Sequence, residues 1–592
     1  MAVAGDEKLT SPHATQSGTP TVELDEEEDG APGESDEQAE QHPLAGIAPG
    51  LPLIPADGPA QSQIDALASA PAPSRKPRTV VDKLNEVAID KMTAADYPGA
   101  LDALRRVLNL TPESPPAHGN VALALWRNKS PPQAEIHCRR ALALNPKYAP
   151  AHRILAELLR ERDAPDALAA YDQLLALDPD SFMAHNNRGL LLNKMGRHRE
   201  ADASFARALE LAPGNPHVRF NQLMAQPDGD LDEAHECCLR ALEERPDNPD
   251  IMTNLGIVLQ FSGRYDDARA QFERVISVAP HHVGAGFNLS LLLLLQGEFA
   301  RGWTAYESRW KLLEVGKPPF AQPKWQGEDL HGKTILLNAE QGFGDAIQAL
   351  RYIPAVAARG ARIVLRIDRP LVRVAASLPG NLVITPSPAR PPAFDMWCPL
   401  LSLPRILGTR IDSIPADAPY LAVRPGIAAR WRERLSHLPG LKVGLAWAGS
   451  PKHVNDFRRT IDLERLKPLL DGGGASFVSL QVGVRAPDVA KLPPGTITDV
   501  SAALTDFAET AGAIVNLDLV IAVDTAVVHL AGALAKPTWV MLPFSPDWRW
   551  LLEREDSPWY PTLRLYRQPK PGDWESVIAR VVADLRERAA AP

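Results

Sequence analysis

The sequence contains few cysteines, few aromatic residues and no long apolar segment. Only four of its 592 residues are cysteine, and Phe, Trp and Tyr together make up 6%. The cysteines show neither the spacing of metal ligands nor the number needed to staple a chain of this length, so we expect buried thiols in a reducing compartment. The longest apolar run, at residues 289–295, contains a serine and is too short to span a bilayer. The N-terminal residues also lack the basic and apolar regions of a signal peptide. These absences predict a cytoplasmic protein without stable membrane insertion.

The chain also lacks an excess of charge outside its first 80 residues. That segment carries 14 acidic and 4 basic side chains, which accounts for the whole formal net charge of −10. The remaining residues carry 59 side chains of each sign, so they create no global field that would attract a polyanion. We therefore expect no nucleic-acid partner.

Residues 1–80 are predicted to form a disordered acidic tail. They are rich in Glu, Asp, Pro, Ala, Gly and Ser, with an acidic run from Glu23 to Asp29. Such a composition cannot bury enough apolar surface to order itself. Two roles stay open: recruitment of a basic partner or, as for most charge runs, solubility alone.

A period of 33 or 34 residues governs the next part of the chain. Helical segments such as ALRRVLNLTP and CRRALALNP end on prolines at positions 112, 146, 179, 213, 246 and 280. This is the length of a tetratricopeptide repeat, a helix-turn-helix unit whose closing proline ends the second helix. Twelve residues before each proline stands an alanine, where two helices must approach closely: Ala100, Ala134, Ala167, Ala201, Ala234 and Ala268. The pattern predicts an α-solenoid over residues 81–315, with a degenerate seventh unit that ends near Trp310 and caps the stack.

From Thr334 the apolar pattern changes to short runs that alternate with helical segments. TILLNA, ARIVLRI, NLVIT and PYLAV are predicted as buried strands of one half, and KVGLAWA, SFVSL, DLVIAVD and TWVMLP as strands of a second. A helical segment at residues 426–438 separates the halves. The alternation predicts two doubly wound α/β lobes facing a cleft, at residues 331–425 and 440–572, followed by a C-terminal helix at residues 573–592.

The first candidate catalytic segment is LNAEQGFGDAIQALRYIP, which joins a predicted strand to a predicted helix. We expect Gly342 and Gly344 to allow a tight turn and Asp345 to begin the helix at the mouth of the cleft. A carboxylate in that place can accept the proton of an attacking hydroxyl as a general base. An aspartate at a helix N-terminus is more often only a cap, so both roles stay open here.

The second segment, VGLAWAGSPKHVNDFRRTIDLERLKPLL, gathers cations in one loop after a predicted strand. Lys452, Arg458 and Arg459 lie within eight residues of one another. Cations at the carboxyl ends of strands suit a diphosphate group, although an exposed basic loop is the simpler alternative.

The third segment, LDLVIAVDTAVVHLAGALAKPTWVMLP, is a predicted strand that ends at Asp524. The following helix begins at Thr525 and Ala526, and His529 lies one turn inside it. Free amides at that helix start can hold phosphate, and Asp524 can accept sugar hydroxyls. From its position alone, His529 is more often a packed core residue than a ligand.

Taken together and in this order, the three segments resemble the family-9 glycosyltransferases, a heptosyltransferase-like group with the GT-B fold. The resemblance covers about residues 331–570. It implies Asp345 as the catalytic base, because the family has an aspartate after its Gly-rich turn. It also implies donor contacts for Asp524, Thr525 and His529, which match a D-T-G-x-x-H segment of the family. Ala526 stands where the family has glycine, which leaves the donor sugar and nucleotide open.

The whole architecture resembles that of bacterial proteins that fuse tetratricopeptide repeats to this type of transferase. The ending PFSPDWRWLLEREDSPWYPTLRLYRQ is similar to theirs, and the flagellin-modifying glycosyltransferases of alphaproteobacteria have this arrangement. The resemblance implies a protein acceptor, with flagellin as the candidate. Repeats also precede a GT-B domain in O-GlcNAc transferase, although the catalytic halves show no close match.

A ladder of asparagines runs through the predicted repeats. Eight residues after the closing prolines, five of six positions are asparagine: Asn120, Asn187, Asn221, Asn254 and Asn288. Each amide offers a donor and an acceptor, so a ladder along a concave groove can pair with the backbone of an extended peptide. This resembles the ladder of O-GlcNAc transferase. Asparagines that bridge neighbouring repeats are the alternative.

The sequence favours a metal-independent glycosyltransferase in which Asp345 deprotonates a Ser or Thr hydroxyl of a protein held by the repeats. Lys452, Arg458 and the helix start at Thr525 would stabilise the departing phosphate of a nucleotide-sugar co-substrate. No Asp-x-Asp cluster occurs in the expected loop, and inversion at the sugar follows from the resemblance only. Two other functional hypotheses stay open: a transferase for a lipid-linked or surface saccharide, and a scaffold with an inactive transferase half.

Overall fold

The structure is a computed structural model of the whole chain, and it describes residues 21–22, 79–161, 166–226, 229–312, 320–340, 342–380, 382–451, 453, 455–472 and 474–590. The chain divides into two compact units. One comprises Ala48–Asn288 and is called the repeat unit below. The other comprises Met1–Ile47 with Leu289–Pro592 and is called the α/β unit. Of the predicted acidic tail, Thr21–Val22 form a short strand, β1, Thr79 and Val80 begin a helix, and the rest lies outside the described residues.

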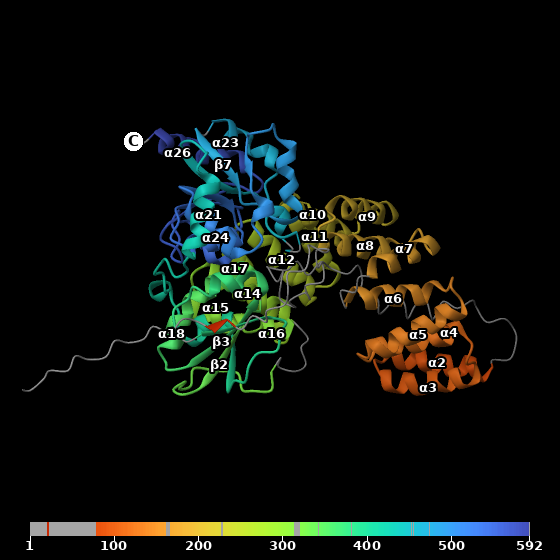
Figure 1. Cartoon of the computed structure of the whole chain (residues 1–592). Coiled ribbons are helices and arrows are strands. Elements are labelled where there is room, and N and C mark those ends of the chain that lie inside the picture. Colours follow the sequence, from red (N-terminus) through yellow and green to blue (C-terminus); the bar gives the residue numbers. More distant parts are fainter. Residues whose placement is uncertain are drawn as a thin grey trace, which may run out of the picture. The chain divides into compact units, whose positions relative to one another are not determined.

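The repeat unit is built of consecutive antiparallel helix pairs, as the 33- and 34-residue period predicted (Figure 1). Its helices are α2 (Val80–Thr93), α3 (Tyr97–Leu110), α4 (Pro115–Arg127), α5 (Pro131–Leu144), α6 (Ala149–Glu161), α7 (Ala167–Leu177), α8 (Phe182–Lys194), α9 (His198–Leu211), α10 (Pro216–Ala225), α11 (Leu231–Glu244), α12 (Pro249–Phe261) and α13 (Tyr265–Val278). Polar N-caps fix where they begin: Asn248 accepts hydrogen bonds from the next turn at α12, and Thr79 and Asp82 form a capping box at α2.

Small residues let the two helices of each pair approach closely. The six alanines that precede the closing prolines are at most 1% exposed, which confirms their predicted role. Glycines do the same on the partner helices. A Cβ on Gly189 would lie 2.7 Å from Phe205 Cε1, and one on Gly256 would lie 2.5 Å from Phe272 Cε1. Each aromatic ring therefore fills the space that a glycine leaves open.

The repeat unit ends earlier than the boundary near residue 315 that the sequence predicted. The division falls inside α14 (Val283–Leu295), and the following α15 (Phe299–Tyr306) and α16 (Arg309–Leu312) belong to the α/β unit. The reason is packing: Phe299 and Trp303 contact the rings of Trp559 and Trp548 in the C-terminal part of the chain. The predicted capping unit is thus part of the α/β unit.

Two parallel sheets form the centre of the α/β unit. The N-terminal sheet has the order β1-β4-β3-β2-β5 and comprises, besides β1, the strands β2 (Thr334–Asn338), β3 (Arg362–Asp368), β4 (Leu382–Ser387) and β5 (Met396–Pro399). The C-terminal sheet has the order β11-β10-β9-β6-β7-β8 and comprises β6 (Leu441–Ala446), β7 (Ala475–Ser479), β8 (Thr498–Asp499), β9 (Leu519–Val523), β10 (Thr538–Leu542) and β11 (Leu563–Arg567). In both sheets the strand order reverses beside the first strand of the lobe, β2 or β6, which confirms the predicted doubly wound architecture.

Helices surround these sheets. In the N-terminal lobe they are α17 (Phe343–Ala349), η1 (Leu350–Tyr352), α18 (Ile353–Ala357), α19 (Arg369–Ala375), η2 (Leu400–Ser402), α20 (Leu403–Ile406) and η3 (Ile411–Ser413). The predicted joint is α21 (Pro425–Leu435). The C-terminal lobe has α22 (Asp456–Arg459), η4 (Leu463–Leu466), α23 (Lys467–Gly472), η5 (Gly483–Lys491), η6 (Ser501–Ala503), α24 (Phe507–Val515), α25 (Ala526–Ala533), η7 (Trp548–Trp550) and α26 (Trp574–Ala590).

One predicted strand is wrong. PYLAV, at residues 419–423, is irregular, and its place in the sheet is taken by β5, which the sequence pattern missed. The backbone N–H groups of Tyr420 and Leu421 donate to the carbonyl of Ala533, so this segment bonds to the C-terminal end of α25 rather than to a strand of the sheet. β5 is only four residues long, too short to produce a periodic signal.

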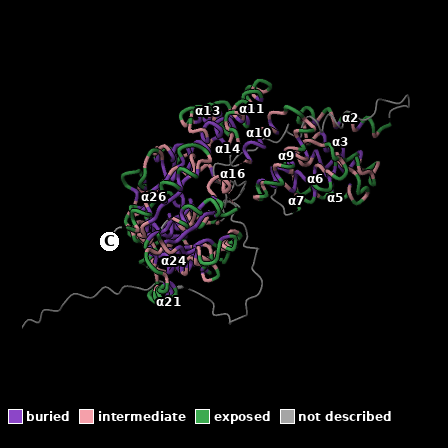
Figure 2. Tube along the Cα trace, turned by 90° about the horizontal axis from the view of Figure 1, so that it is seen from above, coloured by how far each residue is buried: buried purple, intermediate pink, exposed green. Residues whose placement is uncertain are grey.

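Apolar side chains fill the space between sheets and helices. Figure 2 shows buried residues inside the α/β unit and exposed ones along its outside. One cluster joins β6, β7, β9 and β10 with α26, which contributes Trp574, Val577, Ile578, Val581, Val582 and Leu585. The four cysteines are buried free thiols, as expected. Across the described part of the chain, no helix combines the length and hydropathy needed to cross a membrane.

Candidate active site between the two sheets

The predicted site residues lie at the carboxyl ends of the strands where each sheet reverses its order. Asp345 follows β2, the basic loop follows β6, and Asp524 follows β9 directly. Ligands of doubly wound folds bind at this reversal, because the loops on its two sides diverge and leave a crevice. The topology therefore places the three segments where α/β proteins bind their ligands.

The two lobes meet where α17 packs against α25. Gly344 lies at this contact, since a Cβ there would be 2.7 Å from His529 Cδ2 and 3.6 Å from Ala526 Cα. Gly342 has an ordinary extended conformation, with φ −60° and ψ 166°. The predicted reason for these glycines, a tight turn, is therefore wrong. Gly344 is needed because the opposite lobe approaches it closely.

Thr525 precedes the first residue of α25 but does not cap the helix. Its side chain accepts no hydrogen bond from the first turn, and its buried Oγ1 has no partner among the described residues. A threonine in this position normally satisfies one of the free amides. Here the hydroxyl and the amide end of α25 both keep hydrogen-bonding capacity for a ligand, as the sequence predicted for this helix start.

Asp345 lies in the first turn of α17 and forms an ion pair with Arg549 of the opposite lobe. Arg549 is 7% exposed and also binds Gln348 Oε1 at 2.5 Å and Asp547 Oδ1 at 2.7 Å. Its guanidinium lies 4.3 Å from the centre of the Trp548 ring. Burial lowers the pKa of Arg549 to about 10, which leaves it cationic at neutral pH. A buried cation thus joins the candidate base to the C-terminal lobe.

Two carboxyl groups of the C-terminal lobe influence each other beside this pair. Burial raises the pKa of Asp524, and the charge of Arg459 opposes that shift. Burial and the neighbouring Asp524 raise the pKa of Asp547 to about 8. Like charges in a desolvated site cannot both ionise at low cost, so the two groups hold a proton at neutral pH.

His529 is a packing residue in this structure. Its Nδ1 lies 2.9 Å from the hydroxyl of Tyr560, and its ring stacks on Trp550 with centroids 5.6 Å apart. Burial, with the charges of Arg351 and Arg459, lowers the pKa of His529 to about 3. A neutral, enclosed imidazole positions α25 against α17 and carries no charge toward a phosphate.

The basic loop after β6 folds onto itself. Arg459 donates from Nε to Asp456 Oδ1 at 3.0 Å, and a Cβ on Gly449 would touch both groups. Arg458 lies over the ring of Phe457, and burial lowers its pKa to about 10. Both arginines are half-buried, which indicates an ordered cationic wall rather than an exposed loop. Lys452, predicted to bind the donor, lies outside the described residues.

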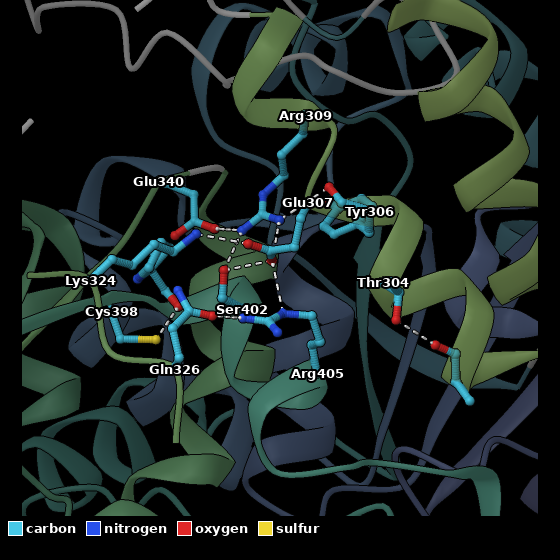
Figure 3. A network of polar contacts seen from close by, with 12 residues as sticks. Thr304, Tyr306, Glu307, Arg309, Lys324, Gln326, Glu340, Cys398, Ser402 and Arg405 are labelled. Atoms are coloured by element: carbon cyan, nitrogen blue, oxygen red, sulfur yellow. Dashed lines mark hydrogen bonds and ion pairs between the residues drawn. The ribbon is translucent and has the colours of Figure 1, made fainter. Parts of the chain in front are cut away.

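A buried ion pair supports the loop that leads to Asp345. Glu340 stands between β2 and α17, and Arg309 of α16 binds its Oε1 at 2.7 Å with neither side chain more than 1% exposed. Arg309 also donates to Ser402 Oγ, and Glu307 binds both Arg309 and Lys324 (Figure 3). The segment that follows the last repeat helix therefore fixes the start of the candidate catalytic loop.

The two carboxyl groups of this network, Glu307 and Glu340, have pKa values shifted in opposite directions. Arg309 and Lys324 outweigh the effect of burial and lower the pKa of Glu307 to about 2. Burial dominates at Glu340 and raises its pKa to about 7. Arg309 Nε and Glu340 Oε2 have no hydrogen-bonding partner in the part of the chain that is described. The pair between Arg309 and Glu340 is therefore incompletely hydrogen-bonded, and the residues packed around it keep the two side chains in place.

Sequence reasoning missed Arg549, Asp547, Glu340 and Arg309. The first two stand in PFSPDWRW, whose aromatic residues and prolines marked an unusual segment without indicating that it reaches another lobe. Glu340 stands inside the Gly-rich segment, five residues before Asp345. The signal available was a charged residue within an otherwise apolar stretch, which suggests a buried partner but does not identify it.

Two asparagines of the ladder form hydrogen bonds to other helices of the repeat unit. Asn187 Nδ2 donates to Glu157 Oε1 at 2.6 Å, and Asn221 Nδ2 donates to Asn186 Oδ1 at 2.9 Å. Asn186 in turn donates to Asn187 Oδ1. These bonds join α6, α8 and α10, which is the bridging role that the sequence left open.

The other ladder members differ. Asn254 is fully buried, and neither atom of its amide has a partner within the described structure. Asn288 is 2% exposed and donates to the Gly284 carbonyl, while its Oδ1 has no partner among the same residues. Asn120 is half-exposed. Peptide binding by the ladder stays a prediction.

Comparison with family models identifies the repeats. Two models described as tetratricopeptide repeat match residues 88–149 and 157–216, and residues 228–285. These ranges cover most of α2 to α13, so the helical part of the chain is a tetratricopeptide-repeat solenoid.

The chain is similar over most of its length to Protein FlbA of Caulobacter vibrioides, with 28% identity over 540 residues, 85% of this chain and 84% of FlbA. It is 28% identical over 222 residues to human Protein O-mannosyl-transferase TMTC3, which covers 34% of this chain and 24% of TMTC3. The structure of a tetratricopeptide repeat protein from Parabacteroides merdae covers 40% of this chain and 94% of its own, at 20% identity and a TM-score of 0.34. The repeat assignment rests on the family models and the helix pairs.

Proposed function

We propose that this protein is a glycosyltransferase that moves a sugar from a nucleotide-sugar donor to a Ser or Thr hydroxyl of a protein. The observation that supports this best is that Asp345 of one lobe is ion-paired with Arg549 of the other, in the helix α17 that packs against α25 at the carboxyl ends of two parallel sheets. Two facing doubly wound lobes with an acid-base residue on one and an anion site on the other suit a GT-B transferase. The similarity of a third of the chain to a protein named as an O-mannosyl-transferase supports sugar transfer.

The donor would bind on the C-terminal lobe. The amide end of α25 and the free hydroxyl of Thr525 suit a phosphate oxygen, and Asp524 suits a sugar or ribose hydroxyl. Arg458, Arg459 and Lys452 would balance the charge of the diphosphate. Ala526 keeps a methyl group at the start of the helix, where a larger side chain would cover the amides.

The reaction would be a single displacement with inversion and without a metal ion. The acceptor oxygen forms a bond to the anomeric carbon, while the bond from that carbon to the phosphate oxygen breaks. The hydroxyl proton passes to the carboxylate of Asp345, and the nucleotide leaves with the electron pair. Arginines and helix amides that face the leaving phosphate stabilise the charge that develops on it.

The repeat unit would hold the acceptor. Tetratricopeptide solenoids present an extended concave surface that suits a polypeptide segment. Asn187 and Asn221 are committed to bonds between repeats, whereas the half-exposed Asn120 keeps its amide available for a peptide backbone. Flagellin is the first acceptor to test, because the arrangement of repeats and transferase resembles that of flagellin-modifying enzymes.

The test is the intact mass of proteins that co-purify with the full-length chain after co-expression, with flagellin included among them. The active chain is compared with its Asp345→Ala variant and with Arg554→Gln, which alters the ion pair between Arg554 and Asp556 on the outside of the C-terminal lobe. A sugar-sized mass increment that disappears with Asp345→Ala and persists with Arg554→Gln supports the proposal. Partners that bind but never gain mass, or an increment that survives Asp345→Ala, contradict it.

A further inference from the structure

Arg549 occupies an unusual place in the candidate active site. It comes from the C-terminal lobe, but two of its partners, Asp345 and Gln348, lie on α17 of the N-terminal lobe. Asp547 holds it from its own lobe, and Trp548 covers one face of the guanidinium. The side chain thus joins the two lobes near the start of α25, where the donor would bind.

This bridge restrains the candidate base. A carboxylate that is ion-paired with a buried arginine favours its charged form and loses affinity for a proton, because the cation is close and water is excluded. General-base catalysis needs a carboxylate that can accept the proton of the attacking hydroxyl. While it is bound to Arg549, Asp345 is therefore poorly suited to that step.

The bridge also lies next to the anion site. Gly344, the neighbour of Asp345, packs directly on the first turn of α25 through Ala526. Thr525, with its unpartnered hydroxyl, precedes that turn. A phosphate bound at the start of α25 would consequently lie close to the ion pair between Asp345 and Arg549.

We propose that Arg549 is a lock on Asp345 that the donor's diphosphate opens. The diphosphate competes with Asp345 for the guanidinium, so that one event binds the leaving group and frees the base. A planar guanidinium binds phosphate and carboxylate oxygens with the same fork geometry, which makes the exchange of partners possible without moving the charge far. Asp547 keeps Arg549 on the C-terminal lobe during the exchange.

The exchange also explains why a buried arginine is placed here. Asp547 remains a partner of Arg549, but the loss of Asp345 removes one of the two carboxyl groups that compensate this desolvated cation, so a second anion favours the opening of the lock. The base is then withheld when no donor is bound and becomes free when the donor binds. This inference rests on the proposed function, since it assumes a nucleoside diphosphate at the start of α25.

The alternative is that Arg549 is only a clamp between the lobes. A clamp and a lock predict opposite effects for removal of the carboxylate. Asp345→Asn would loosen a clamp and weaken ligand binding. The same change would remove the competitor in a lock and strengthen the binding of a diphosphate.

The experiment measures the dissociation constants of uridine, guanosine, adenosine and cytidine diphosphates on the full-length protein by calorimetry. For the nucleotide that binds best, Asp345→Asn is expected to tighten binding at least about threefold. Arg549→Gln is expected to weaken it by about 10- to 100-fold, the usual effect of one lost charge-assisted hydrogen bond to phosphate. Arg554→Gln serves as the matched control and should leave the constant unchanged.

The double variant Asp345→Asn/Arg549→Gln separates the lock from simple repulsion between carboxylate and phosphate. In a lock, Asp345→Asn no longer tightens binding once Arg549 is removed. If tightening persists in the double variant, or if Asp345→Asn weakens binding, the lock is refuted. Should Arg549→Gln fail to fold, Arg549→Lys provides the background, because it keeps the charge but loses the fork.

The same data distinguish the lock from the proposed function. If no nucleoside diphosphate binds either the unaltered chain or Asp345→Asn, the proposed donor site itself is refuted. If one binds with an affinity that is indifferent to both single changes, only the lock is refuted.

Discussion

The repeat unit and the α/β unit bury polar side chains in different ways. In the repeat unit, Asn187 and Asn221 bond to groups on the adjacent repeats, and the pattern recurs every 33 or 34 residues. In the α/β unit, the buried cation of Arg549 pairs with Asp345, which lies 204 residues away in the sequence and in the other lobe. Bonds between adjacent repeats serve stability, whereas a buried charge that joins two lobes at the carboxyl ends of their strands points to function.

The largest expected loss of folding stability comes from breaking the buried ion pair between Arg309 and Glu340 in the α/β unit. Arg309→Met leaves Glu340 without its cation, and the loss of one partner of a buried ion pair typically costs about 3–5 kcal/mol. Eleven of the twelve tryptophans lie in the α/β unit, so tryptophan fluorescence during urea unfolding reports this unit almost alone.

Arg301→Gln is the control for this change, because it breaks an exposed pair on α15 and is expected to cost less than about 1 kcal/mol. Adding Glu340→Gln to Arg309→Met should restore part of the loss. Equal costs for Arg309→Met and Arg301→Gln would contradict a structural role for the buried network.

A smaller loss of folding stability is expected from a substitution at the contact between the lobes. Gly344→Ala places a methyl group 2.7 Å from His529, and overpacking of this kind costs about 1–3 kcal/mol. Gly426→Ala is the matched control, since nothing lies within 4 Å of its Cβ position in α21. Thermal unfolding followed by tryptophan fluorescence compares the two. An unchanged midpoint for Gly344→Ala would show that the lobes do not meet as described.

The carboxyl pair predicts a dependence on pH that the repeat unit does not share. Asp547 has a folded-state pKa of about 8, above the ordinary aspartate value, so the folded protein holds a proton that the unfolded chain releases. Its contribution therefore destabilises the α/β unit as the pH rises from about 4 to about 8, by at most about 1.4 kcal/mol per pH unit. Urea midpoints at several pH values should show that Asp547→Asn removes this slope. A slope that is identical in the variant would contradict the raised pKa.

The smallest effects separate two kinds of ladder asparagine. Asn187→Ala removes a bond between repeats and is expected to cost about 1 kcal/mol. Asn254→Leu removes a buried amide that has no partner among the described residues, so it should be neutral or slightly stabilising. Helical circular dichroism during heating measures both. A larger loss for Asn254→Leu than for Asn187→Ala would indicate that position 254 makes a bond that this account lacks.

The sequence predicted local features well, because their causes are local. The repeat period, the close-packing alanines, the two doubly wound lobes and the helix that begins directly after Thr525 all follow from side chains near one another in the chain. The family models confirm the repeats, and the parallel sheets confirm the lobes.

The errors arose where the cause is distant in sequence. PYLAV has the composition of a strand, but its backbone bonds to Ala533, more than 100 residues away. Gly344 is constrained by His529 rather than by its own turn. Arg549 reaches Asp345 from the opposite lobe. Periodicity and propensity contain no information on such pairs. The sequence therefore identified the three segments of the candidate site but not the contacts between them.

The most direct test of the central claim is the rate of sugar transfer by the full-length chain and by Asp345→Asn, measured with a captured acceptor and its nucleotide-sugar. We expect a rate about 100- to 10,000-fold lower for Asp345→Asn, because this is the usual contribution of a general base, with nucleoside diphosphate affinity undiminished. Equal rates for the two proteins would contradict a catalytic site between the two lobes.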